Sequence, residues 1–158
     1  MKNLNKLFVG AAALVLLTAC GPSKVSYEKF HEKAEAAAEK DPGYTKATAK
    51  GTFYSNNLGI EVTIKLNNTF VKGNEGWVLK EGEESNAGTL AAIGLLSMRA
   101  STVGENDKTT YYAGNGFKTV TTSDKGDTTI VYNSNGYVTS YKGLLAGGDA
   151  NFKFSWSK

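Results

Sequence analysis

The chain has 158 residues, 21% of them charged, with 18 Lys and Arg against 15 Asp and Glu. No basic block occurs and Arg99 is the only arginine in the sequence. This argues against nucleic-acid binding, which depends on clustered Lys and Arg. The 18 Gly against 2 Pro, together with many Thr, Asn and Tyr, favour short strands and tight turns over disorder.

The N-terminal residues have the order of a secretory signal peptide, positive, then apolar, then small. Lys2 and Lys6 precede an unbroken apolar run over 7–17. That run is shorter than the roughly 20 residues that a membrane-spanning helix needs. The residues Leu17-Thr18-Ala19-Cys20 resemble the lipobox of bacterial lipoproteins. The resemblance implies cleavage before Cys20 and a diacylglycerol on its thioether, with further acyl chains such as palmitate.

This resemblance divides the chain into a signal peptide over 1–19, a tether over 20–26 and a single β-rich domain over 27–158. Stable membrane attachment takes at least two acyl chains, which a lipidated Cys20 would supply. We therefore expect a lipid anchor in the cell membrane or outer membrane, facing the extracytoplasmic side. The alternative is an uncleaved anchor helix with an incidental cysteine. Loss of residues 1–19 leaves 16 basic against 15 acidic residues, a nearly neutral domain.

Residues 27–40 are predicted to form a helix with Ser26 as its N-cap, and Asp41-Pro42-Gly43 is expected to end it. Apolar residues recur there at spacings of three and four, which gives one apolar stripe to pack on a sheet. His31, the only histidine in the sequence, lies among charged neighbours and is interpreted as a surface residue.

Beyond residue 44 the period changes to two, which predicts an antiparallel sheet with one buried and one wet face. A turn is expected at Asn67-Asn68. The predicted strands, about eight in all, cover 45–54, 60–66 with 69–72, 77–79, 109–113, 117–122, 128–132, 137–142 and 151–157. In the last of these, Phe152, Phe154 and Trp156 share one face, which belongs to a core or to an apolar concave wall.

The segment 81–101 interrupts the strands with an apolar helical stretch, which Ser85 or Thr89 could cap. Its apolar side chains spread around the helix, and such a helix must be covered on several sides. Three interpretations stay open: a core helix, a lid over an apolar cavity, and a membrane-touching segment. The side chains concerned are Leu90, Ile93, Leu95, Leu96 and Met98.

No motif of an enzyme or metal site occurs in the sequence, which lacks HExxH, CxxC and a calcium loop. His31 has no partner residues in a catalytic pattern, and Gly114-Asn115-Gly116 is interpreted as a hairpin turn and not a phosphate loop. The pair Glu83-Glu84 is interpreted as solvated loop surface. We therefore expect no enzyme activity, no cofactor and no metal.

The order of lipobox, helix, three strands, apolar helix and about five strands resembles the LolA/LolB and LppX/LprG lipoprotein and lipid carriers. The resemblance implies an α+β fold in which a curved antiparallel sheet, a half-barrel, wraps apolar helices and holds acyl chains.

The first hypothesis is thus a non-enzymatic, membrane-anchored binder or carrier of a lipid or acyl ligand. The second is an envelope interaction or scaffold module with a filled core and a protein partner. Under the first hypothesis the ligand-binding residues are Leu90, Ile93, Leu95, Leu96, Met98, Phe152, Phe154 and Trp156.

Overall fold

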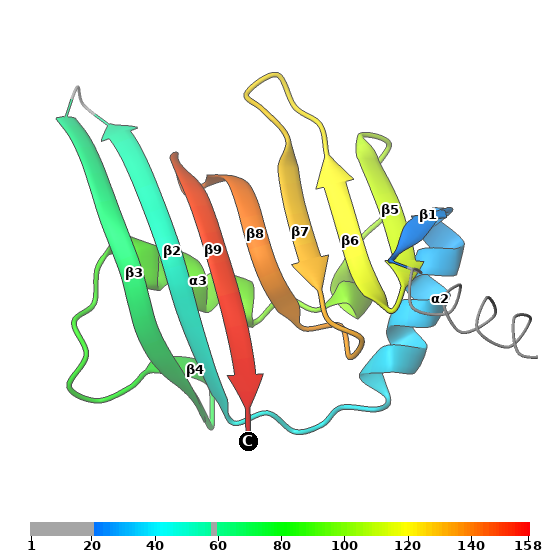
Figure 1. The fold of residues 1–158 in the computed structure, drawn as a ribbon, viewed down its shortest axis with the longest axis horizontal. Helices are drawn as coiled ribbons and strands as arrows, with labels where there is room; N and C mark the ends of the chain where they lie inside the picture. Colours follow the sequence, from blue (N-terminus) through cyan, green and yellow to red (C-terminus); the bar gives the residue numbers. More distant parts are fainter. Residues whose placement is uncertain (1–20, 58–59) are drawn as a thin grey trace, which may run out of the picture.

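The computed structural model of the chain describes residues 21–57 and 60–158 (Figure 1). The predicted signal peptide and the lipobox with Cys20 lie outside these residues. The described part is an α+β fold, as predicted, with two α-helices and one open antiparallel sheet of nine strands. Within it, no helix has both the length and the apolar character needed to cross a membrane.

The strands follow one another across the sheet in the order β1-β5-β6-β7-β8-β9-β2-β3-β4. The first of them, β1, lies inside the segment expected to be a free tether and pairs with β5. The domain therefore begins closer to Cys20 than the sequence suggested. The strand bounds are β1 Ser23–Val25, β2 Lys46–Asn57, β3 Ile60–Gly73, β4 Gly76–Leu79, β5 Thr109–Gly114, β6 Gly116–Thr121, β7 Thr128–Tyr132, β8 Val138–Leu145 and β9 Gly148–Ser157.

The turn expected at Asn67-Asn68 was wrong, because β3 runs straight through these two residues. Asn67 pairs with Lys50 and Asn68 pairs with Ala49 in an unbroken register with β2. Asn68 is only 9% exposed, yet its side chain has hydrogen-bond partners on the following loop, the nearest being Glu83. A buried amide that is satisfied in this way is compatible with a strand.

Both helices lie on the same face of the sheet (Figure 1). Helix α2, Tyr27–Ala38, is capped by the Ser26 hydroxyl, which accepts a hydrogen bond from the Lys29 amide over 3.4 Å. Its Phe30 is fully buried, with ring centroids 5.3 Å from Tyr111 and 5.6 Å from Phe117. Helix α2 therefore covers the β5–β6 end of the sheet, and α3, Ala87–Leu96, covers the β2–β3 end.

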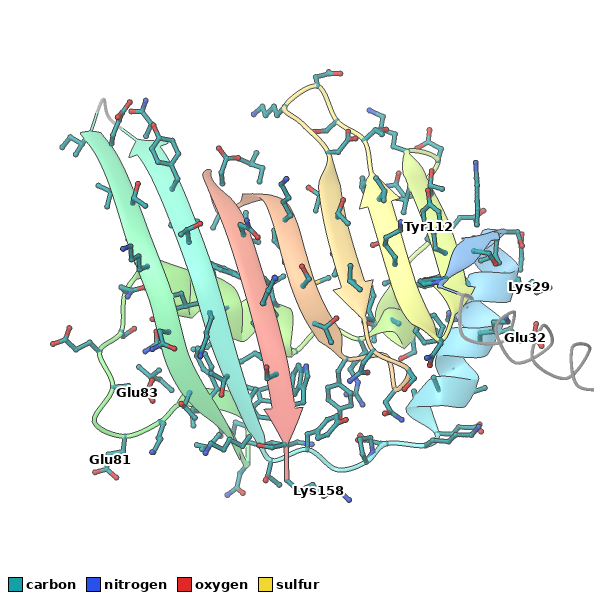
Figure 2. All side chains as sticks on the ribbon, in the orientation of Figure 1. Lys29, Glu32, Glu81, Glu83, Tyr112 and Lys158 are labelled. Atoms are coloured by element: carbon teal, nitrogen blue, oxygen red, sulfur yellow. The ribbon has the colours of Figure 1, made fainter. Side chains whose placement is uncertain are left out.

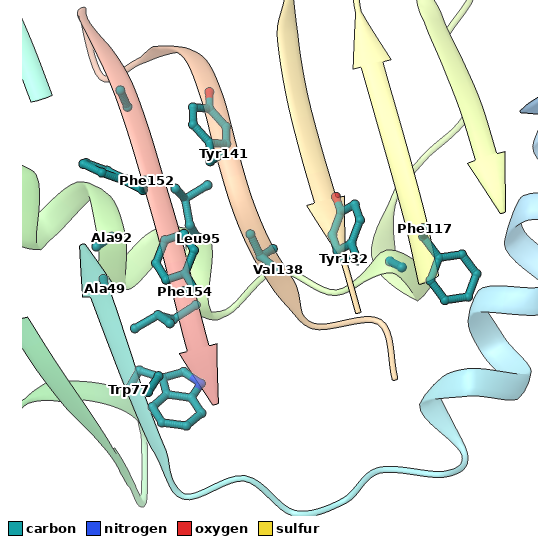
Figure 3. Packing of buried hydrophobic residues seen from close by; sticks show 14 of the residues in the cluster. Ala49, Trp77, Ala92, Leu95, Phe117, Tyr132, Val138, Tyr141, Phe152 and Phe154 are labelled. Atoms are coloured by element: carbon teal, nitrogen blue, oxygen red, sulfur yellow. The ribbon is translucent and has the colours of Figure 1, made fainter. Parts of the chain in front are cut away.

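The core fills the space between the sheet and the helices (Figure 3). Phe152 and Phe154 of β9 meet Leu95 of α3 there, and Trp77 closes the end near β4. Full burial of a side chain of this size contributes about 1.5–3 kcal/mol. Among the described residues, this core cluster runs from Val25 to Trp156.

Candidate functional site

Helix α3 begins at a capping box. In this motif the side chain of the N-cap residue accepts a hydrogen bond from the amide three residues later, and the side chain of that later residue accepts one from the N-cap amide. The Thr89 amide donates to Asn86 Oδ1 over 3.0 Å, and the Asn86 amide donates to Thr89 Oγ1 over 3.2 Å. The N-cap is thus Asn86, where Ser85 or Thr89 had been expected. The reciprocal bonds satisfy amides that a helix start otherwise leaves without partners.

A buried polar cluster ties this end of α3 to β3. The Thr89 hydroxyl donates to Asn68 Oδ1 over 3.3 Å, and Asn68 Nδ2 donates to Glu83 Oε2 over 3.0 Å. The Thr69 amide donates to the same carboxylate oxygen over 2.7 Å. Burial raises the pKa of Glu83, but these hydrogen bonds outweigh it and leave that pKa below its ordinary value. Glu83 is therefore a structural anchor and not the freely solvated residue that was expected.

The β2–β3 hairpin extends well beyond α3 (Figure 1). The 14 residues of β3 reach about 48 Å, whereas the 10 residues of α3 reach about 15 Å. Apolar side chains near the tip of β3 consequently point to the helix side of the sheet without a helix above them. Ile60 is 65% exposed and Val62 is 43% exposed.

The uncovered stretch and α3 together form a groove of about 500 Å³, which we call the α3 groove. It is open on one side, where Leu90 of α3 stands 66% exposed. Helix and sheet are in contact beside the groove, since a Cβ at Gly88 would lie 3.6 Å from Phe53 and from Ile64, an ordinary van der Waals distance. The lining residues are Phe53, Ser55, Val62, Ile64, Ala87, Leu90, Ala91 and Ala146.

The composition of this lining limits its chemistry. Ser55 is the only polar side chain among the lining residues, and none of them titrates in the physiological range. General acid–base catalysis needs a titratable group within hydrogen-bond reach of the substrate, and the lining offers none. The volume falls within the range of about 300–1,000 Å³ typical of small-molecule sites, which are mostly apolar. The groove is thus suited to holding an apolar group.

The structure separates the eight side chains predicted to bind a ligand. Leu90 lines the groove. The other seven do not. Three lie on α3, Met98 follows that helix, and three lie on β9, between β8 and β2. Four are core residues at 5% exposure or less, namely Leu95, Leu96, Phe152 and Phe154. Ile93, Met98 and Trp156 are partly buried and pack against that core.

Trp156 belongs to an aromatic cluster at the opposite end of β9. Its ring centroid lies 4.6 Å from that of Tyr137 and 5.2 Å from that of Trp77. Its indole Nε1 donates to the Val138 carbonyl over 2.7 Å. The indole of Trp156 thus has a hydrogen-bond partner and aromatic neighbours of its own. It contributes to packing at this end of the sheet and does not reach the α3 groove.

Half of the lining residues come from β2 and β3, which the sequence analysis had not singled out as ligand-binding. The clean alternation of Ile60, Val62, Ile64 and Leu66 was the available signal. That apolar face is longer than a helix of about 15 Å can cover, so part of it had to stay open. Periodicity shows which face is apolar, but helix placement decides which part is covered.

A second hollow, of about 580 Å³, lies between β1, α2 and β5, and it is larger than the α3 groove. Its lining includes Lys24, Glu105 and Asp107, whose mixed charges do not favour an apolar ligand. We therefore take the α3 groove as the candidate site.

His31 is partly buried, stacks on Tyr27 with ring centroids 5.6 Å apart and has its Nε2 3.3 Å from Glu35. It is not among the lining residues of either hollow, although Tyr27 lines the second one. In residues 21–57 and 60–158 no group of three or more His, Cys, Asp or Glu side chains is placed to hold a metal ion.

Searches found no protein-family model, no curated protein and no solved structure that matches this chain. Its function is therefore inferred from its own geometry.

Proposed function

We propose that this chain is a membrane-anchored, non-enzymatic binding protein that holds an acyl chain or similar apolar ligand in the α3 groove. The observation that carries the proposal is an uncharged groove of about 500 Å³ beside α3, with Leu90 left exposed at its rim. The proposal is supported by the resemblance in element order to the LolA-like carriers, in which acyl chains lie between a curved sheet and helices.

The driving force is the apolar surface that remains in water when the groove is empty. Val62 and Leu90 line the groove and are exposed at 43% and 66%, and Ile60, two residues before Val62 on β3, is exposed at 65%. Covering apolar surface releases about 25 cal/mol per Å², and each methylene of a buried acyl chain contributes about 0.8 kcal/mol. An acyl chain of about ten methylenes laid along these side chains therefore gains about 8 kcal/mol, within the range of about 4–15 kcal/mol that association costs.

The lining also indicates which ligand chemistry is disfavoured. A carboxylate or phosphate buried against this lining would find no charged partner and only the Ser55 hydroxyl as a polar group. An unpaired charge in such surroundings is costly. We infer that the polar end of the ligand stays at the open side, in solvent, and that binding selects for the acyl chain.

The test uses the chain from Gly21 onward, which contains the whole described core, and a fluorescent fatty acid as the probe. We expect saturable binding, and a Leu90→Asp variant should weaken it at least tenfold because a carboxylate at the rim disfavours an apolar ligand. The matched control is Val78→Asp, which changes an apolar residue that is 49% exposed and lies outside the groove lining. Native mass spectrometry of the purified chain reports any ligand carried through purification.

Two results would overturn the proposal. One is a clean ligand-free mass combined with no binding of the fatty acid. The other is an equal loss of binding in the Leu90 and Val78 variants, which would indicate nonspecific adsorption. Saturable capture of an apolar helical peptide with no affinity for fatty acids would favour the alternative, a protein-interaction module.

Membrane attachment is tested separately, by mass spectrometry of the N-terminal peptide from membranes. A lipidated peptide beginning at Cys20 supports the anchor. An unmodified peptide beginning at Met1 would rule the lipoprotein proposal out and leave the groove proposal standing.

A further inference from the structure

The sheet face opposite the helices collects positive charge. Strand register decides which side chains lie on it, since residues directly paired across an antiparallel ladder share a face. Acidic residues reach this face from the strands only at Glu61 and Asp149, both toward the β2–β3 tip. The lysines on it are Lys24, Lys46, Lys50, Lys65, Lys118, Lys142 and Lys153. We call them the open-face lysines.

These lysines make the charge distribution strongly uneven in a nearly neutral domain. The described part of the chain holds 16 basic and 15 acidic residues. The strands place seven basic and two acidic residues on the open face, and Lys125 and Asp127 of the β6–β7 loop line a hollow beside Lys142 and Asp149 on that face. This leaves eight basic and 12 acidic residues elsewhere. One face thus carries a net charge of about +5 and the rest of the domain about −4.

The arrangement is also unfavourable for the isolated domain. Lys50 on β2 lies directly opposite Lys153 on β9, and like charges at such positions destabilise a sheet. Within residues 21–57 and 60–158, none of the open-face lysines has a carboxylate within 4.0 Å. Lys118 instead places its Nζ 4.0 Å over the ring of Tyr112, which Figure 2 labels on β5. Repulsion between lysines that no carboxylate of the domain relieves indicates a negatively charged partner outside the domain.

We propose that the open face docks on the surface of a membrane rich in anionic phospholipid. The lysines are separate, strongly hydrated point charges spread over six strands, with no arginine among them, which suits many headgroups better than one bidentate anion. The inference rests on the lipid anchor proposed above, which would hold the domain close to the membrane. Only Gly21 and Pro22 separate Cys20 from β1, so an anchored Cys20 would hold β1 within about 11 Å.

The span of the lysines sets the orientation that the proposal requires. From Lys24 on β1 to Lys65 on β3 there are seven strand spacings, about 34 Å in total. Electrostatic attraction is screened over about 8 Å at physiological ionic strength. If the sheet stood upright on its β1 edge, only Lys24 and its nearest neighbours would feel the headgroups. Lysines on β2 and β9 contribute only when the face lies along the membrane.

The experiment measures co-sedimentation of the chain from Gly21 onward with phosphatidylcholine vesicles, with and without phosphatidylglycerol. The test variant changes Lys50, Lys142 and Lys153 to Gln, and the control changes Lys29, Lys33 and Lys40 to Gln. Both lose the same total charge, but the control residues lie on α2 or directly after it and are exposed. Both variants are first compared with wild type by thermal unfolding.

We expect binding that requires phosphatidylglycerol and weakens steeply with salt. Each lysine near the membrane surface raises the affinity for anionic vesicles roughly fivefold. The affinity of the test variant should therefore fall on the order of 100-fold, and that of the control variant much less. Leu90→Asp should leave this binding unchanged, which separates it from the groove proposal.

Three outcomes would overturn the inference: no binding to anionic vesicles, equal losses in the two triple variants, or binding to soluble polyphosphate without binding to vesicles. The last would identify the face as a site for a soluble polyanion.

Discussion

The Thr89 hydroxyl of α3 donates a hydrogen bond over 3.3 Å to Asn68 Oδ1, in the middle of β3. Thr89 is fully buried, and its Oγ1 also accepts from the Asn86 amide. One side chain therefore closes the helix cap and fastens the helix to the sheet. The link joins the start of α3, which borders the α3 groove, to the middle of β3.

Replacing Thr89 with Val should destabilise the domain by about 1–3 kcal/mol, because the shape is kept while the buried Asn68 Oδ1 and the Asn86 amide lose their partner. Urea unfolding followed by circular dichroism measures the change. The control is Ser85→Ala in the exposed loop before the cap, which should change the stability by less than about 0.5 kcal/mol. Equal stabilities for the two variants would contradict the assigned role of Thr89.

Glu83 should make the stability depend on pH in the acidic range. Its pKa in the folded state lies below the ordinary value of 4.5, since the hydrogen bonds from Thr69 and Asn68 outweigh the effect of burial. A lowered folded pKa stabilises the fold above the unfolded pKa, and this contribution is lost as the pH falls through the folded pKa. The stability difference between wild type and Glu83→Gln should thus be largest at neutral pH and shrink below pH 4.5. Urea titrations at several pH values measure it. A pH-independent difference would contradict the prediction.

Tyr132 should control part of the alkaline unfolding. Burial raises its pKa from 10.0 to about 12, an effect that the nearby Thr119 side chain reduces. Among the described residues the Tyr132 hydroxyl has no partner in good hydrogen-bond geometry. Because the pKa of Tyr132 is higher in the folded state, its protonated hydroxyl contributes to the free energy of unfolding. This contribution is complete below pH 10.0 and is lost as the pH rises through about 12. The loss is on the order of 2–3 kcal/mol.

Tyr132→Phe should therefore be at least as stable as wild type at neutral pH, and it should lose less stability between pH 10.0 and about 12. Tyr112→Phe, on the half-exposed open face, is the control and should follow wild type. Thermal unfolding across this pH range measures both. A strongly destabilised Phe variant at neutral pH would show that the hydroxyl has a partner.

Two glycines should respond to alanine in opposite directions. Gly51 on β2 has φ +152°, and a Cβ there would lie 2.0 Å from the Asn151 carbonyl oxygen of β9. Gly51→Ala should destabilise the domain by at least about 2 kcal/mol. Gly94 on α3 is exposed with nothing within 4 Å, so Gly94→Ala should stabilise it by up to about 1 kcal/mol through helix propensity. Melting temperatures that move in the same direction would refute this close approach of β2 and β9.

Local patterns in the sequence determine the secondary structure because each depends on neighbouring residues. The alternation of Ile60, Val62 and Ile64 predicted a strand with one apolar face, and β3 is that strand. The prediction from local patterns failed at Asn67-Asn68, because asparagines are typical of turns. The side chains of Glu83 and Thr89, which are distant in sequence, provide the hydrogen bonds that allow Asn68 inside a sheet. The α+β class and the antiparallel sheet followed from the pattern.

The sequence by itself thus determined the strands, the apolar face of each, and the presence of more apolar surface near α3 than one helix face uses. Only the tertiary structure decided where that surplus lies. Leu95 and Phe152 are covered, whereas Leu90 and Val62 are not, because α3 is shorter than the hairpin on which it packs. It also decided that scattered lysines such as Lys50 and Lys153 become neighbours. Their pairing depends on the register of β2 with β9, and contacts between distant strands leave no trace in a local pattern.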